Sequence, residues 1–76
     1  MTTTTTTLLD LRALAAPEPM ERVLDTLDRL HDYADLRVLL AREPHPLYPI
    51  LARMGYAWRT DWQPDGACLV AIARAA

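Results

Sequence analysis

Five side chains that can carry charge or contact a ligand lie in two proline-rich turns. These side chains are Glu18, Arg42, Glu43, His45 and Tyr48. The first turn has the sequence Ala-Ala-Pro-Glu-Pro over 15–19, and the second has Arg-Glu-Pro-His-Pro-Leu-Tyr-Pro over 42–49. A carboxylate beside an imidazole can hold a metal ion, brace a turn or contact a polar ligand. Because each turn follows an apolar segment and precedes a helical pattern, the two turns are the natural place for a site.

The residue types leave two interpretations of His45 open. It lies between two prolines just before a helix, so it can brace the turn, or it can contact a ligand or a metal ion. Glu43 and Glu18 would then complete the set of metal ligands, although one imidazole with two carboxylates matches an iron site only in residue types. Glu18 also has a simpler role, as an acidic residue in the first turn of a helix. We expect Tyr48 to cover the core beneath the turn and to keep its hydroxyl in water.

Hydrophobic spacing predicts the elements around the first turn. Partial alternation over 8–14 predicts a strand. Apolar residues at spacings of three and four predict a helix over 17–30, in which Pro17 and Pro19 fit the first turn. These apolar residues are Met20, Val23, Leu24, Leu27 and Leu30. The polar segment over 31–35 then predicts a loop, and His31 at the helix end is expected to be structural.

The second half of the chain predicts a strand, a short helix and a hairpin. The apolar run over 36–41 is typical of an interior strand. A short helix follows and is closed by Gly55. Its apolar residues are Leu47, Ile50, Leu51 and Met54. The segment over 56–62 alternates aromatic and polar residues, and Gln-Pro-Asp-Gly over 63–66 predicts a turn into a last strand over 68–73.

The predicted order is β-α-β-α-β-β, an α+β fold. We expect a two-layer α/β sandwich with a four-stranded mixed sheet and both helices on one face. A strand–helix–strand unit of this length implies a right-handed crossover and a parallel pair. Parallel neighbours end at the same edge of the sheet, here called the rim, so both turns are expected there. We expect 1–7 to be a disordered leader and 8–76 to be a single domain.

Composition and charge disfavour several classes of function. The net charge is −2, with eight arginines and no lysine, so the chain lacks the basic balance of a nucleic-acid binder. It has no apolar run of 18 residues and no signal-peptide pattern, so we expect a cytoplasmic protein that does not bind membranes. The single cysteine excludes an internal disulfide, and no Cys/His spacing matches a zinc finger. A phosphate-binding glycine loop and a nucleophile–base arrangement are also missing, which disfavours an enzyme.

Trp58 and Trp62 share one face of the predicted hairpin. Facing inward they would complete the core, which is the default interpretation. Facing outward they would create an apolar surface of the kind that contacts a partner or a second copy. We expect a monomer or a weak homodimer.

The segment over 9–19, with its strand, Pro-Glu-Pro turn and following helix, resembles the opening of the TusA/SirA-like sulfur carriers. The chain is more similar to a related bacterial family of unknown function, sometimes fused to hemerythrin-like or cupin domains. That similarity is carried by the turns over 17–19 and 43–49 and by Gly-Tyr-Ala-Trp over 55–58, and it extends over 8–74. The resemblance implies a TusA-like domain and no firmly assigned activity.

One position departs from the sulfur carriers. Their acceptor cysteine stands just before the first proline of the turn, where this chain has Ala16, which has no atom that can carry sulfur. We expect Cys68 to be a packing residue in the last strand, far from the rim and therefore a poor substitute.

Two functions of different classes remain, and a third has weaker support. The preferred one is a non-catalytic binding or accessory module that presents the rim to a partner protein or a small ligand. The alternative is a metal- or redox-linked protein that uses His45, Glu43 and Glu18, an idea to which the fusions of the resembling family lend weight. The weaker alternative is a sulfur carrier that uses Cys68. The sequence requires no cofactor.

Overall fold

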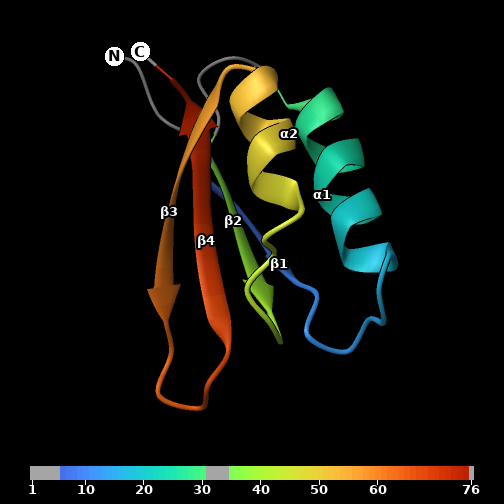
Figure 1. Cartoon of the computed structure of the whole chain (residues 1–76), viewed down its shortest axis with the longest axis vertical. Coiled ribbons are helices and arrows are strands. Elements are labelled where there is room, and N and C mark those ends of the chain that lie inside the picture. Colours follow the sequence, from blue (N-terminus) through green and yellow to red (C-terminus); the bar gives the residue numbers. More distant parts are fainter. Residues whose placement is uncertain (1–5, 31–34, 76) are drawn as a thin grey trace.

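Four strands form one mixed sheet, and two helices cover one of its faces (Figure 1). The computed structural model describes residues 6–30 and 35–75. In chain order the elements are β1 (Thr6–Asp10), α1 (Glu18–Arg29), β2 (Asp35–Leu40), α2 (Leu47–Arg53), β3 (Tyr56–Trp62) and β4 (Cys68–Arg74). The predicted fold class and element order are confirmed.

The strands lie in the order β1-β2-β4-β3. β1 and β2 are parallel, in a register that runs from Thr6 opposite Asp35 to Asp10 opposite Leu39. β4 is antiparallel to both of its neighbours, β2 and β3. The predicted parallel pair is therefore confirmed, and the turns after β1 and β2 leave the sheet at the same edge, the rim.

The helices form where the apolar spacing predicts them. α1 starts just after Pro17, has acidic residues in its first turn and buries Val23 and Leu27 against the sheet. α2 buries Leu47 and Leu51. It ends one residue before Met54, whose side chain is 40% exposed rather than part of the predicted apolar stripe.

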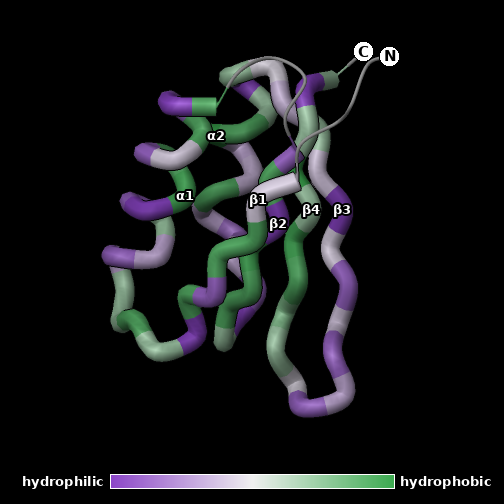
Figure 2. The backbone as a smooth tube through the Cα atoms, turned by 180° about the vertical axis from the view of Figure 1, so that it is seen from behind, coloured by the Kyte–Doolittle hydropathy of each residue, from purple (hydrophilic) through white to green (hydrophobic). Residues whose placement is uncertain are grey.

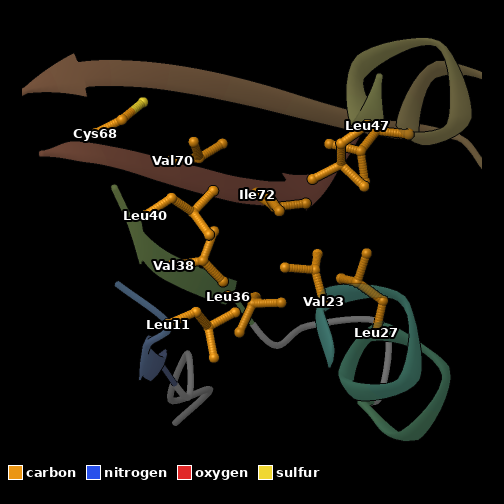
Figure 3. Close-up of a cluster of buried hydrophobic side chains, with 11 residues drawn as sticks. Leu11, Val23, Leu27, Leu36, Val38, Leu40, Leu47, Cys68, Val70 and Ile72 are labelled. Carbon is orange, nitrogen blue, oxygen red and sulfur yellow. The ribbon is translucent and has the colours of Figure 1, made fainter. Parts of the chain in front are cut away.

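The core fills the space between the sheet and the helices (Figure 3). Alternate residues of β2 and β4 point into it, as expected for strands that are covered on one face. From the strands come Leu36, Val38, Leu40, Cys68, Val70 and Ile72. The two strands of the hairpin differ in hydropathy (Figure 2). β4 is mostly hydrophobic, whereas hydrophilic residues recur along β3.

β1 is shifted relative to the predicted strand. It begins at Thr6, so Thr6 and Thr7, which were assigned to the leader, belong to the sheet and pair with β2. It ends at Asp10 because the chain turns after Leu11, where the Leu14 N–H donates to the Leu11 carbonyl at 3.2 Å. Residues 1–5 of the expected leader and residues 31–34, with His31 among them, lie outside the described part of the chain.

Two leucines on adjacent strands offer a direct test of the core. Leu36 in β2 is fully buried, whereas Leu8 in β1 is 64% exposed. We expect Leu36→Ala to lower the free energy of unfolding by about 2–5 kcal/mol, because it leaves a cavity. Leu8→Ala should change it by less than about 0.5 kcal/mol. Urea unfolding followed by circular dichroism measures both, and equal losses would contradict this assignment of the core.

Candidate functional site

Three loops meet at the rim, one more than the sequence predicted. The third is the β3–β4 hairpin, which arrives there because β4 pairs with β2 in a register that places Cys68 opposite Leu40. The Arg12 guanidinium joins the first and third loops, with its Nη1 donating to Asp65 Oδ2 at 3.3 Å. The same guanidinium bonds Asp10 and holds the pKa of that carboxyl at about 2.

Side chains of the second turn and of β3 form a group of interacting residues, which we call the Tyr48 cluster. Its members are Glu43, His45, Tyr48, Trp58 and Thr60. The Tyr48 hydroxyl donates to Glu43 Oε2 at 3.0 Å and lies 2.7 Å from Thr60 Oγ1. Because the hydroxyl has only one proton, Thr60 is the donor in the second bond. The Tyr48 ring stacks on Trp58 with centroids 5.1 Å apart and an angle of 5° between the rings.

His45 completes the cluster at its exposed end. Its Nε2 lies 3.3 Å from Glu43 Oε1, so Glu43 uses one carboxylate oxygen for Tyr48 and the other for His45. The imidazole also meets the Tyr48 ring edge-on, at 5.9 Å between centroids. The His45 side chain is 75% exposed and that of Glu43 only 27%. The cluster therefore presents an imidazole to solvent and keeps its support behind it.

Burial sets the protonation of Tyr48. Removal from water raises the pKa of the Tyr48 hydroxyl, the bond with Thr60 lowers it, and the neighbouring Glu43 carboxylate raises it again. Tyr48 is thus a neutral donor at ordinary pH. The hydroxyl that was expected in water has two protein partners, Glu43 and Thr60, in a part-buried position.

Glu18 and Arg42 do not join the cluster. Glu18 pairs within its own helix, 3.5 Å from Arg22 Nη2, as i,i+4 charges on a helix do. Arg42 is exposed and makes no hydrogen bond or ion pair with the rest of the described chain. Over residues 6–30 and 35–75, no three His, Cys, Asp or Glu side chains lie close enough to hold a metal ion. The proposed set of His45, Glu43 and Glu18 is therefore not assembled.

Cys68 lies at the rim, which corrects the expectation that it would be far away. Its neighbours in the sheet are Leu40 and Trp62. The side chain is fully buried in the core, so its role in packing agrees with the sequence. Burial raises the pKa of the Cys68 thiol, and the carboxylates of Glu43 and Asp61 raise it further. A sulfur acceptor needs the opposite, a lowered pKa that yields a thiolate.

The two tryptophans of β3 have different environments. Trp58 packs against the core, as the default interpretation predicted. Trp62 is 60% exposed, so the same prediction is wrong for it. The reason is its place at the hairpin end of β3, which projects beyond both helices (Figure 1).

Sequence reasoning missed Thr60 in the Tyr48 cluster and two residues at the rim, Arg12 and Asp65. Thr60 had a signal, because alternation along β3 places it on the same face as Trp58. The contact between Arg12 and Asp65 had none, because the two residues are 53 positions apart and meet only once the strand order is known.

A family model of uncharacterised conserved proteins, DUF2249, matches residues 8–74. The chain belongs to this family. The DUF2249 match spans both turns and the whole Tyr48 cluster, so the resemblance to a family of unknown function is confirmed. The relation to the sulfur carriers and the fusions to other domains stay predictions. No curated protein and no solved structure matches the chain. None of the helices in the described part is both long and apolar enough to cross a membrane.

The hydroxyl of Tyr48 can be removed without its ring. We expect Tyr48→Phe to lower the free energy of unfolding by about 1–2 kcal/mol, because Glu43 and Thr60 lose a partner. Tyr56→Phe is the control, since the Tyr56 hydroxyl has no hydrogen bond within the described residues. It should have little effect in the same urea titrations, and equal effects of the two substitutions would contradict the network.

The same variant also tests the raised pKa. A group whose pKa is higher in the folded state gives its full stabilisation below its unfolded value, which is about 10 for tyrosine. The stability of the wild-type protein should therefore fall as the pH rises above about 10. Tyr48→Phe lacks this component, so the difference in stability between the two proteins should narrow there. A difference that is constant with pH would show that Tyr48 titrates normally.

The burial of Cys68 predicts a slow thiol. We expect native protein to react with Ellman's reagent roughly a hundredfold or more slowly than protein unfolded in urea, because reaction requires opening of the core. The control is Ala52→Cys in a Cys68→Ala background, which places the thiol on an exposed helical position. If native Cys68 reacts as fast as this control, the thiol is accessible and the sulfur-carrier alternative regains support.

Proposed function

We propose that this protein is a non-catalytic binding module that docks a partner protein on the rim through His45 and Arg42. The observation that carries this proposal is the chain of contacts from Thr60 through Tyr48 and Glu43 to His45. These contacts lead from β3 to the exposed imidazole of His45.

The cluster restricts His45 before any partner arrives. Glu43 lies beside one imidazole nitrogen and the Tyr48 ring meets the imidazole edge-on, so fewer side-chain conformations remain to be lost on binding. Interactions between preorganised groups give more net affinity than those between mobile ones. Nε2 is the nitrogen that faces the Glu43 carboxylate, at 3.3 Å, which leaves the Nδ1 atom of His45 for a partner.

Arg42 adds a second contact of a different chemistry. Arg42 is exposed, and the next residue in the chain is Glu43, which accepts a hydrogen bond from Tyr48. Five N–H donors in a planar fork suit a carboxylate or a phosphate on the partner. Arginine is also among the residues that contribute most to protein interfaces. The second turn thus offers a cation and an imidazole, both of them exposed.

The two alternatives have less support. A metal-linked role needs a third ligand, and Glu18 pairs with Arg22 instead of approaching His45. A carrier role for Cys68 needs an accessible thiolate, whereas this thiol is buried and its pKa is raised.

The test combines site-specific crosslinking with titration. A photo-crosslinking amino acid at exposed position 46, beside His45, should capture a partner in cells, whereas one at position 37 on the uncovered face of the sheet should not. The purified partner is then titrated against the variants. We expect His45→Ala and Arg42→Ala each to weaken binding by about tenfold or more. Arg53→Ala, at the far end of α2, is the matched control and should bind as the wild type does.

Two results would overturn the proposal. One is capture of the same partner from both crosslinking positions. The other is a partner whose affinity is unchanged by His45→Ala and Arg42→Ala.

A further inference from the structure

β3 is an edge strand with a free outer side. The strand order places it at one end of the sheet, and within the described residues β4 is its only strand partner. An exposed edge of seven residues is a ready template for pairing with another strand.

Two hydrogen bonds show which backbone groups point outward. The Gln63 N–H donates to Ala67 at 2.8 Å, and the Gly55 carbonyl accepts from the Ala75 N–H at 2.9 Å. Both residues thus face β4, and so does every second residue between them, because backbone direction alternates along a strand. The intervening residues direct their N–H and C=O groups to the free edge. They are Tyr56, Trp58, Thr60 and Trp62.

The end of this strand is self-complementary. The sequence over 58–62 is Trp-Arg-Thr-Asp-Trp, so an antiparallel second copy centred on Thr60 places like aromatics and opposite charges together. Trp58 then lies opposite Trp62 of the other copy, and Arg59 lies opposite Asp61. Aromatic pairs and opposite-charge pairs are both favourable across strands.

We propose that the protein forms a two-fold dimer in which β3 pairs antiparallel with β3 of a second copy, centred on Thr60. The outward N–H and C=O groups of Thr60, Trp58 and Trp62 form the ladder between the copies. The result is one eight-stranded sheet with all four helices on the same face. Because Trp62 of the second copy lies beside Trp58, it extends the aromatic wall of the Tyr48 cluster.

The exposure of the side chains favours a second copy as the occupant. Arg59 is 83% exposed and Asp61 is 56% exposed, and the pair they form within the chain is long, at 3.9 Å. Trp62 is a large apolar side chain left 60% exposed. The hairpin end of β3 projects beyond the helices, so α2 does not block this part of the edge (Figure 1).

Charge also fixes the register. A pairing centred on Arg59 would place two arginines opposite each other, and one centred on Asp61 would place two aspartates together. Like charges directly opposite are destabilising. Of these three registers, only the one centred on Thr60 pairs Arg59 and Asp61 with opposite charges. A strand from another protein would need a matching Asp and Arg at the same spacing to do this.

Charge reversal tests this arrangement. Sedimentation equilibrium over a wide range of concentration should show the wild type in a monomer–dimer equilibrium. Arg59→Asp should weaken dimerisation by about tenfold or more, because it faces two carboxylates with each other, and so should Asp61→Arg. Mixing these two variants should restore dimers. The β3 strand of one variant then carries two acidic residues and that of the other carries two basic ones, so each pair across the strands has opposite charges. A variant that had failed to fold could not do this.

Trp62→Pro provides a second, independent arm. Within the described residues the Trp62 N–H points to the free edge and has no partner. Proline therefore removes a backbone bond and an aromatic contact between the copies but no bond to β4, and circular dichroism should show the native fold. We expect the dimer to be lost. The proposal is overturned if the wild type is monomeric throughout, if the variants dimerise as it does, or if the mixture associates no better than either variant alone.

Discussion

The arrangement of the site depends on the insertion of β4 between β2 and β3. This pairing runs from Leu36 opposite Ile72 to Leu40 opposite Cys68, and it buries alternate residues of both strands against the helices. It brings the hairpin to the edge where the two proline-rich turns already lie. It also moves β3 to the outside of the sheet. The composition of the rim and the free edge of β3 are therefore two consequences of one set of backbone hydrogen bonds.

The types of the elements could be predicted from the sequence, because periodicity reports which side chains are buried. The strand order could not, since the pattern of β4 is the same whether or not β2 is its neighbour. This is why Cys68 was placed far from the rim, although it lies directly across from Leu40. The exposure of Trp62 could not be predicted for a related reason. Alternation shows which face of the sheet a side chain is on, but it does not show where the helix that covers this face ends.

The candidate site was predictable where it is local. Glu43, His45 and Tyr48 are close in sequence, and the turn that joins them to α2 brings them into contact. Glu18 begins α1, after the turn that leaves the same edge of the sheet. Its side chain nevertheless pairs with Arg22, one helical turn away. A shared edge places two turns in one region, but the direction of each side chain and its nearest opposite charge decide whether the side chains meet.

The strands also determine where a tether can be attached. β1 begins at Thr6 and β4 ends at Arg74, and the pairing places both residues at the edge of the sheet opposite the rim, beside Asp35 and Tyr56. A tag or linker joined at Thr6 or at Arg74 would therefore start at the edge of the sheet away from His45 and Arg42. The protein can thus be attached through the edge of the sheet opposite the rim while the rim stays accessible to a partner.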